Sequence, residues 1–287
     1  MLNIKKSIIG VLTVASFAFT GTAALSASCP KSGGVLKFGV KAEPPTYDMH
    51  GTNSYAVMHF VAQHYSTLLT FDWDKFPKLE GDVADTWNQS SDGLTYTFKI
   101  KKGIKFHDGS PLTSADVKAT YDRLRSPPKG VISVRKALFS SIDTITTPDD
   151  STVIFKLKKA DAFMMDGFAS PFNAIYSAKD IAKDPKWHLK NINGSGPYKF
   201  VSHSKGESWK ATKYNDFHHG DNCLDGTEGY RIKKLAEPLI GGQIMAEWRG
   251  TAPPERVLLK KQMGDDVSFQ AKTLMTAWVV SLNSKTK

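Results

Sequence analysis

Residues 79–125 constrain the fold of this 287-residue chain more than any other stretch. Apolar side chains alternate there with threonine and lysine, and the apolar set is Leu94, Tyr96, Phe98 and Ile100. A period of two predicts a strand with one buried and one solvated face. Residues 90–93, just before this strand, read Ser-Ser-Asp-Gly, which is typical of a tight turn. The pattern therefore predicts a β-hairpin.

A second turn and a helix follow this hairpin. Ile104 and Phe106 continue the strand-like alternation up to turn residues at 107–111. Thr113 offers an N-cap oxygen, and Asp116 lies three residues later, which is the spacing of a capping box. Apolar residues then recur at helical spacing until two prolines end the helix, namely Val117, Tyr121 and Leu124, then Pro127 and Pro128.

Other segments predict a mixed α/β chain. Strands are expected at 34–40, 142–145 and 152–157, and a short helix is expected at 163–168. Asn53 or Ser54 can cap a further helix. Its apolar positions recur at helical spacing, at Val57, Val61, Tyr65 and Leu68. Glycines at 194 and 196 permit a tight backbone course between segments.

The wording of these segments resembles one family. Residues 92–98 read DGLTYTF and residues 101–117 read KKGIKFHDGSPLTSADV, while EPPTYD at 43–48 and GSGPYKF at 194–200 fit as well. Together they resemble the peptide/nickel class (family 5) of extracytoplasmic solute-binding proteins. These are receptors of ABC importers for dipeptides, oligopeptides and related solutes. The likeness covers essentially the whole mature chain but only the N-terminal part of the family's length.

The resemblance implies a periplasmic binding protein type II-like fold with a first lobe and its additional subdomain. The expected lobe I core is discontinuous and incomplete, at 28–70 and 191–287, and the inserted subdomain spans 71–190. The expected second lobe is missing, because the chain ends near the strand by which the family enters its hinge.

The N-terminus predicts export. Two lysines precede an apolar run and a set of small residues, so residues 1–27 are expected to be a signal peptide. This run is too short to span a membrane comfortably. Lipid anchoring at Cys29 is the less favoured alternative, because the preceding leucine lies four residues before the cysteine rather than three. Cys29 and Cys223 are the only cysteines, and the sequence leaves open whether they form a disulfide.

Composition excludes some classes of partner. Hydrophobic residues at 40% and charged residues at 23% are values of a globular chain. The net charge of +10 could favour nucleic acid, but lysine and arginine are scattered among the acids, so no nucleic-acid partner is expected. The expected protein is a monomeric, exported chain with a mixed surface.

No motif supports catalysis or a cofactor. The chain has no nucleophile elbow, phosphate loop or paired metal motif, and it is predicted not to be an enzyme. The segment with most metal-like character contains His218, His219, Asp221 and Cys223. Because adjacent histidines rarely bind the same ion, this segment is interpreted as a structural loop, with no metal site and no cofactor.

The resemblance also nominates a ligand site. In the family, the loop after the first strand faces the cleft between the lobes, which nominates Asn53, Ser54 and Tyr55. A second contact loop corresponds to Arg249 and Gly250, and Trp278 lies near the hinge strand. Each could instead be packing or surface, since aromatic side chains are often core.

The resulting hypothesis is the substrate-binding component of an ABC importer for peptides or related solutes. It would capture a ligand in the cleft and deliver it to an inner-membrane permease. One alternative is a truncated, non-transporting fragment or interaction module. The other is a receptor for nickel or another metal chelate.

Overall fold

The computed structural model describes residues 29, 32–72, 74–220, 222–234, 236–247 and 252–269. Several sequence predictions lie outside these residues. They are the signal peptide at 1–27, Asp221, Arg249, Gly250 and Trp278. The structural statements that follow concern the described residues alone.

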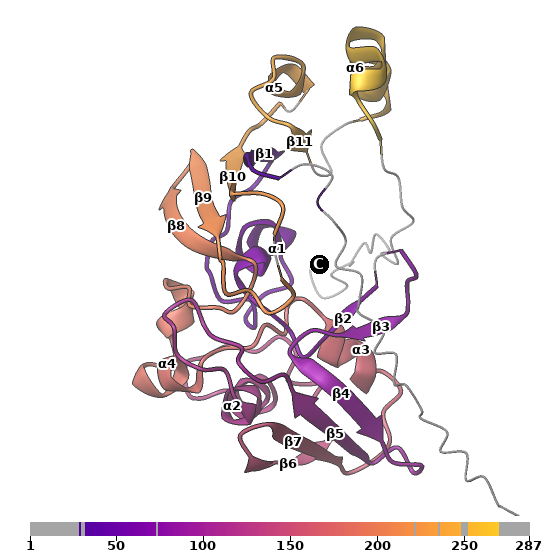
Figure 1. The fold of residues 1–287 in the computed structure, drawn as a ribbon, viewed down its shortest axis with the longest axis vertical. Coiled ribbons are helices and arrows are strands. Elements are labelled where there is room, and N and C mark those ends of the chain that lie inside the picture. Colours follow the sequence, from indigo (N-terminus) through magenta and orange to yellow (C-terminus); the bar gives the residue numbers. More distant parts are fainter. Residues whose placement is uncertain are drawn as a thin grey trace, which may run out of the picture.

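A five-stranded sheet combines strands from both ends of the chain (Figure 1). Its order is β11 (Ala246–Glu247), β1 (Val35–Val40), β10 (Gly226–Arg231), β9 (Ser208–Lys213) and β8 (Tyr198–Ser204). Strand β1 is parallel to β10 and β11, whereas β10, β9 and β8 pair antiparallel. The carboxyl ends of β1, β10 and β11 therefore meet at one edge of this sheet.

A four-stranded antiparallel sheet lies at the other end of the molecule (Figure 1). Its order is β4 (Ala84–Gln89), β5 (Thr95–Ile100), β7 (Thr152–Leu157) and β6 (Ile142–Asp149). A small hairpin of β2 (Leu69–Phe71) and β3 (Leu79–Gly81) precedes it. The predicted alternation in β5 is confirmed, because Tyr96, Phe98 and Ile100 are buried and Lys99 is exposed.

Helices connect the strands. They are α1 (Tyr55–Val61), α2 (Ser114–Arg125), α3 (Met164–Ala169), α4 (Ala178–Lys183), α5 (Ala236–Ile240) and α6 (Pro253–Met263). Short 3-10 turns are η1 (Ala62–His64), η2 (Trp187–Leu189) and η3 (Gly264–Asp266). The predicted start of α2 is confirmed, because the Thr113 N–H donates to the Asp116 carboxylate at 2.8 Å. Its apolar stripe, Val117, Tyr121 and Leu124, is fully buried.

Two local predictions were wrong. Ile104 and Phe106 are buried, but their segment is no strand, since its ladder pairing is one isolated bridge between Lys105 and Pro111. The helix capped by Ser54 ends at Val61 and continues only as η1, so Tyr65 and Leu68 lie beyond it. Both residues are still buried, because the chain enters the core there in a non-helical conformation.

Two apolar clusters form the core. The larger one packs the four-stranded sheet against α2 and α3, and the smaller one packs α1 against β1 and Trp209. Leu68 and Leu69 belong to the larger cluster, whereas Ala174 and Tyr176 belong to the smaller one. Each cluster therefore contains residues from both sides of a predicted domain boundary, the larger one across 70/71 and the smaller one across 190/191. These boundaries stay a prediction.

The segment 194–196 passes very close to the backbone of residues 64–65, at the end of η1. A Cβ built on Gly194 would lie 1.8 Å from the carbonyl oxygen of His64, and one on Gly196 would lie 2.5 Å from the Tyr65 nitrogen. The Gly196 N–H donates to the same His64 carbonyl at 3.0 Å. The tight course predicted for these glycines is confirmed, and its cause is this backbone crossing.

Replacing Gly194 by alanine should therefore destabilise the fold. The added methyl group meets backbone atoms that cannot rotate away, so we expect a loss of about 3 kcal/mol, the upper end of typical overpacking costs. Urea denaturation followed by tryptophan fluorescence measures it. Gly103→Ala is the control, because a Cβ there has open space and meets only the strain of a positive φ. An equal loss in the two variants would contradict the packing argument.

Cys29 and Cys223 form a disulfide that joins residues 194 positions apart in the sequence. It fastens the segment before β1 to the loop before β10. The Cys29 sulfur is consumed by this bond, so the same atom has no thiol left for a lipid. A disulfide of this kind fits an oxidising compartment outside the cytoplasm.

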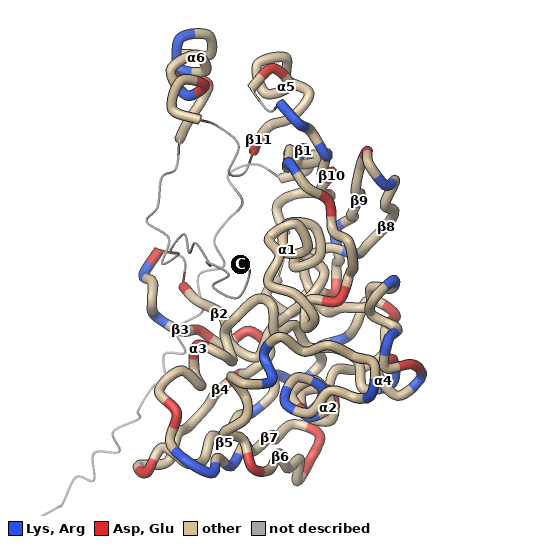
Figure 2. The backbone as a smooth tube through the Cα atoms, turned by 180° about the vertical axis from the view of Figure 1, so that it is seen from behind, with Lys and Arg blue, Asp and Glu red and all other residues tan. Residues whose placement is uncertain are grey.

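Positively and negatively charged residues are mixed along the described chain and are not gathered into a stripe of one sign. Figure 2 shows lysine and arginine interspersed with aspartate and glutamate over the described chain. None of the helices in the described ranges has the length and apolar character that a bilayer span requires.

Candidate functional site

The loop after β1 is anchored by a buried ion pair. The Arg123 Nη2 atom of α2 donates to the Asp48 carboxylate at 2.7 Å, and both side chains are almost fully buried. Burial opposes ionisation of Asp48, but the charge and hydrogen bonds of the Arg123 guanidinium help to hold the pKa of Asp48 below its usual range. The Tyr176 hydroxyl also donates to Asp48, at 3.2 Å. A charge pair of this kind fixes the path of the loop.

Two histidines stack on the ring of Tyr176, the tyrosine that donates to Asp48. The rings of His50 and His188 are stacked on Tyr176, with centroids 4.0 Å and 3.7 Å from the tyrosine ring. All three side chains are fully buried. Burial lowers the pKa of His50 to about 3 and holds the pKa of His188 well below its usual value. The loop is therefore supported by neutral imidazoles.

The nominated residues Asn53, Ser54 and Tyr55 form the end of this loop and the start of α1. The Ser54 hydroxyl accepts the Ala56 N–H at 3.2 Å, so Ser54 is the N-cap of the helix. Asn53 is exposed, whereas Tyr55 is half-buried and its ring is 6.4 Å, edge-on, from that of Phe172. The structure brings the three together, with Ser54 already engaged in capping.

Arg135, which is distant from Asn53 in the sequence, holds the Asn53 side chain in place. Its Nη2 atom donates to the Asn53 side-chain oxygen at 2.8 Å and to the Thr52 carbonyl at 2.9 Å. The guanidinium is nearly buried and lies over the Phe172 ring, 4.6 Å from its centroid. Burial lowers the pKa of Arg135 to about 10, so it stays charged at neutral pH. The sequence did not nominate Arg135 or Phe172, because each is far in the sequence from Asn53 and Tyr55 and contacts them only in the folded chain.

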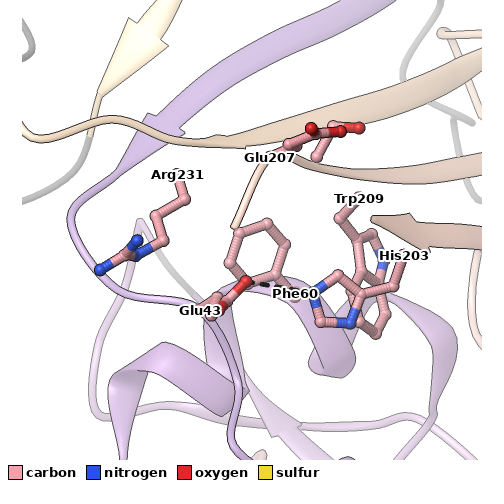
Figure 3. A pocket seen from close by; sticks show the side chains of 7 residues that line it. Glu43, Phe60, His203, Glu207, Trp209 and Arg231 are labelled. Carbon is pink, nitrogen blue, oxygen red and sulfur yellow. Dashed lines mark hydrogen bonds and ion pairs between the residues drawn. The ribbon is translucent and has the colours of Figure 1, made fainter. Parts of the chain in front are cut away.

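A shallow pocket lies at the carboxyl edge of the parallel strands (Figure 3). Glu43 follows β1, Arg231 ends β10, and His203 and Trp209 come from the β8–β9 hairpin. The Glu43 carboxylate accepts the Gly206 N–H and lies 3.4 Å from His203 Nε2. The Gly206 hydrogen bond lowers the pKa of Glu43, although partial burial opposes it. This pocket has no interior space for a water molecule, so these groups interact mainly with one another.

A second pocket of about 180 Å³ lies over the ion pair of Asp48 and Arg123. Its rim includes Thr46, Ile132 and Lys186. Ligand pockets for small molecules usually measure 300 Å³ or more. Neither of these two pockets can enclose a peptide by itself.

The four residues of the metal-like segment, 218–223, do not form one cluster among the described residues. Cys223 is in the disulfide, and Asp221 lies outside the described residues. His218 and His219 instead approach Asp82, which sequence reasoning did not nominate. Arg249, Gly250 and Trp278 also lie outside the described residues, so their nomination stays a prediction.

Fold and sequence define the class of protein. Residues 78–285 match the family described as bacterial extracellular solute-binding proteins, family 5, middle region. This match spans more than half of the chain, and the chain belongs to that family. The mixed α/β architecture is that of type II periplasmic binding proteins.

Particular relatives make the class more specific. A Brucella ovis protein named as an ABC transporter peptide-binding protein is 34% identical over 172 residues, covering 58% of this chain and 32% of the relative. The glutathione-binding protein GsiB of Pectobacterium atrosepticum is 35% identical over 147 residues, covering 51% of this chain and 28% of the relative.

A solved structure has the same architecture. The periplasmic binding protein DppA of Helicobacter pylori, in complex with the peptide STSA, superposes with a TM-score of 0.74 at 25% identity. The superposition covers 80% of this chain and 49% of the other. The chain thus spans about a third of the length of the two sequence relatives and about half of this structure.

Proposed function

We propose that this chain captures peptides, or solutes of related chemistry, outside the cytoplasm and presents them to an ABC permease in the membrane. Membership of the family 5 solute-binding proteins is the observation that carries this proposal. The signal-peptide pattern at 1–27 and the disulfide support an exported receptor.

The described geometry supports a contact surface at 53–55. Asn53 presents an exposed amide, and its orientation is fixed by Arg135 at 2.8 Å. Tyr55 adds an aromatic wall beside Phe172. Peptide recognition combines polar groups for the main chain with aromatic walls for side chains. Because neither of the two pockets described above is large enough to enclose a peptide, the affinity of this chain alone should be low.

The test is a ¹H–¹⁵N NMR titration of the mature chain with a dipeptide, a tetrapeptide and glutathione. We expect saturable shifts of the amide signals of residues 53–55 with at least one of these ligands. Tyr55→Ala should weaken binding about 5- to 30-fold, which is the loss of one aromatic contact of 1–2 kcal/mol. Asn53→Ala should weaken it in the same direction.

Asn88→Ala is the matched control. Asn88 is also an exposed asparagine, but it lies on β4 of the four-stranded sheet, so its loss should leave the affinity unchanged. Absence of any saturable shift up to ~10 mM ligand, which corresponds to a binding free energy weaker than about −3 kcal/mol, would refute the receptor proposal. Binding that is equal in wild type, Asn53→Ala and Tyr55→Ala would refute the assignment of the surface.

A further inference from the structure

Two adjacent histidines, His218 and His219, lie beside the carboxylate of Asp82, and none of the three belongs to the loop at 53–55. His218 Nε2 lies 2.8 Å from Asp82 Oδ1, and His219 Nε2 lies 3.0 Å from the same oxygen. One ligand atom from each residue lies within 4.8 Å of the others. The histidines come from the loop after β9, whereas Asp82 lies in the turn between β3 and β4.

A turn explains how adjacent histidines point the same way. The Gly220 N–H donates to the Phe217 carbonyl at 3.1 Å, and Gly220 has a φ of +94°. In an extended segment, consecutive side chains would point to opposite faces. Here the two imidazole centroids are only 4.4 Å apart. In this conformation, two adjacent histidines can therefore face the same ion.

The loop that carries both histidines is held at its far end. Asn222 donates to the Pro197 carbonyl at 2.8 Å, and Cys223 is fixed by the disulfide. The imidazoles thus lie on a braced loop. A braced loop reduces the entropy that ordering the ligands would cost.

Asp82 is oriented by a second set of contacts. Its Oδ2 atom accepts the Thr67 N–H at 2.7 Å and the Thr67 hydroxyl at 3.3 Å. This leaves Oδ1 directed at the two histidines. Outer contacts of this kind fix the orientation of metal-binding carboxylates in proteins. The Asp82 side chain is only 14% exposed, whereas that of His219 is 38% exposed and opens the cluster to solvent.

We infer that Asp82, His218 and His219 bind one Zn²⁺ ion. Two imidazoles and one carboxylate are a known zinc ligand set, and they leave a fourth position open to water or to a donor atom of a solute. Tetrahedral zinc ligands lie about 3.3 Å from each other at the usual bond lengths, so each nitrogen must move away from the Asp82 oxygen by only about 0.4 Å. On binding, each Nε2 lone pair faces the metal and the ring proton moves to Nδ1. The Nδ1 atom of His218 is buried without a hydrogen-bond partner in the described chain, so this proton shift offsets part of the binding free energy.

One nearby charge opposes the cation. The Lys101 ammonium group donates to the Gly81 carbonyl at 3.2 Å, next to Asp82 in the chain. The carboxylate of Asp82 offsets this charge. The metal would also join the loop after β9 to the β3–β4 turn, so Zn²⁺ should raise the melting temperature by mass action.

The test uses the untagged, disulfide-bonded chain, first stripped with EDTA and then titrated with ZnCl₂ in a calorimeter. We expect one ion per chain, a higher melting temperature with Zn²⁺, and no binding of Mg²⁺, which prefers oxygen ligands. Asp82→Asn and His219→Gln should each weaken Zn²⁺ binding at least tenfold. Co²⁺ in place of Zn²⁺ should give the intense visible absorption of a tetrahedral site.

Glu43→Gln is the matched control. Glu43 is also a carboxylate beside an imidazole, but its ion-pair partner is the single imidazole of His203, at 3.4 Å, so its loss should not change Zn²⁺ affinity. If Asp82→Asn fails to fold, the half-exposed His219→Gln variant decides the question, because it leaves the Thr67 contacts intact. Equal Zn²⁺ affinity in wild type and His219→Gln, or absence of Zn²⁺ binding to the wild type, would overturn the inference.

Discussion

The free energy of unfolding should fall steeply as the pH is lowered from about 6.5 to 4. His50, His64 and His107 are held neutral in the folded protein: burial lowers the pKa of His50 and His64 to about 3 and that of His107 to about 4. In the unfolded chain the ordinary value is 6.5. Between these values the unfolded state binds more protons, so stability is complete above pH 6.5 and is lost towards acid.

Hydrogen bonding gives a structural reason for the neutral state. His64 Nε2 accepts from the Trp209 indole N–H at 3.1 Å, and His50 Nδ1 accepts from Arg123 at 2.9 Å. Indole and guanidinium groups can only donate, so the facing imidazole nitrogen must keep its lone pair. The other nitrogens donate to the carbonyls of Tyr198 and Ala174. Protonation would break one bond in each case.

Each such histidine should contribute about 1.4 kcal/mol per pH unit below about pH 6. Urea denaturation at pH 7, 6, 5 and 4.5, with EDTA present, measures the slope. In His64→Gln the slope should decrease by the contribution of one proton, since glutamine can accept from Trp209 and donate to Tyr198 without titrating.

Tyr214→Phe is the control for this pH experiment. Its hydroxyl donates to the Phe106 carbonyl at 3.1 Å, so the variant should be less stable at every pH and keep the wild-type slope. A stability that is flat between pH 6.5 and 4.5 would show that these imidazoles are not held neutral.

Breaking the buried ion pair should be the most damaging single change at neutral pH. Asp48→Asn keeps the shape of the side chain but places an amide against the Arg123 guanidinium. Both groups are donors there, and the arginine side chain is only 1% exposed. Removing one partner of a buried pair typically costs about 3–5 kcal/mol, because the other charge stays buried. The free energy of unfolding at pH 7 should fall by that amount.

A control and a double variant separate the ion pair from general damage. Asp122→Asn changes the neighbouring position of α2, where the carboxylate is 34% exposed and pairs with Lys118, so it should cost only a small fraction as much. In the double variant Asp48→Asn with Arg123→Met, the loss should be smaller than the sum of the single losses. Additive losses would mean that the two side chains are not coupled.

Local patterns predicted much of the fold. The hairpin of β4 and β5, the capped start of α2 and the N-cap at Ser54 were all predicted from residues within a few positions of each other. The predictions failed where tertiary contacts replaced local ones. Ile104 and Phe106 are buried by the larger core without pairing as a strand, and Tyr65 is buried by the smaller core outside the helix.

The candidate site was predicted less completely. Asn53, Ser54 and Tyr55 stay predicted ligand contacts, and Arg135, which orients Asn53, is 82 positions away in the sequence. No spacing rule links such distant residues. The same holds for Asp82, which lies 136 positions before His218.

The sequence by itself determined the family, the short-range elements and the presence of a signal-peptide pattern, because these depend on residue order over short stretches. The tertiary structure alone decided that Cys29 pairs with Cys223, that His50 and His64 are neutral, and that Asp82 faces two histidines. Each of these depends on two segments meeting across the packed sheets. The chemistry of an imidazole or a carboxylate is set by the neighbours that such packing provides, and hydrophobic periodicity does not encode them.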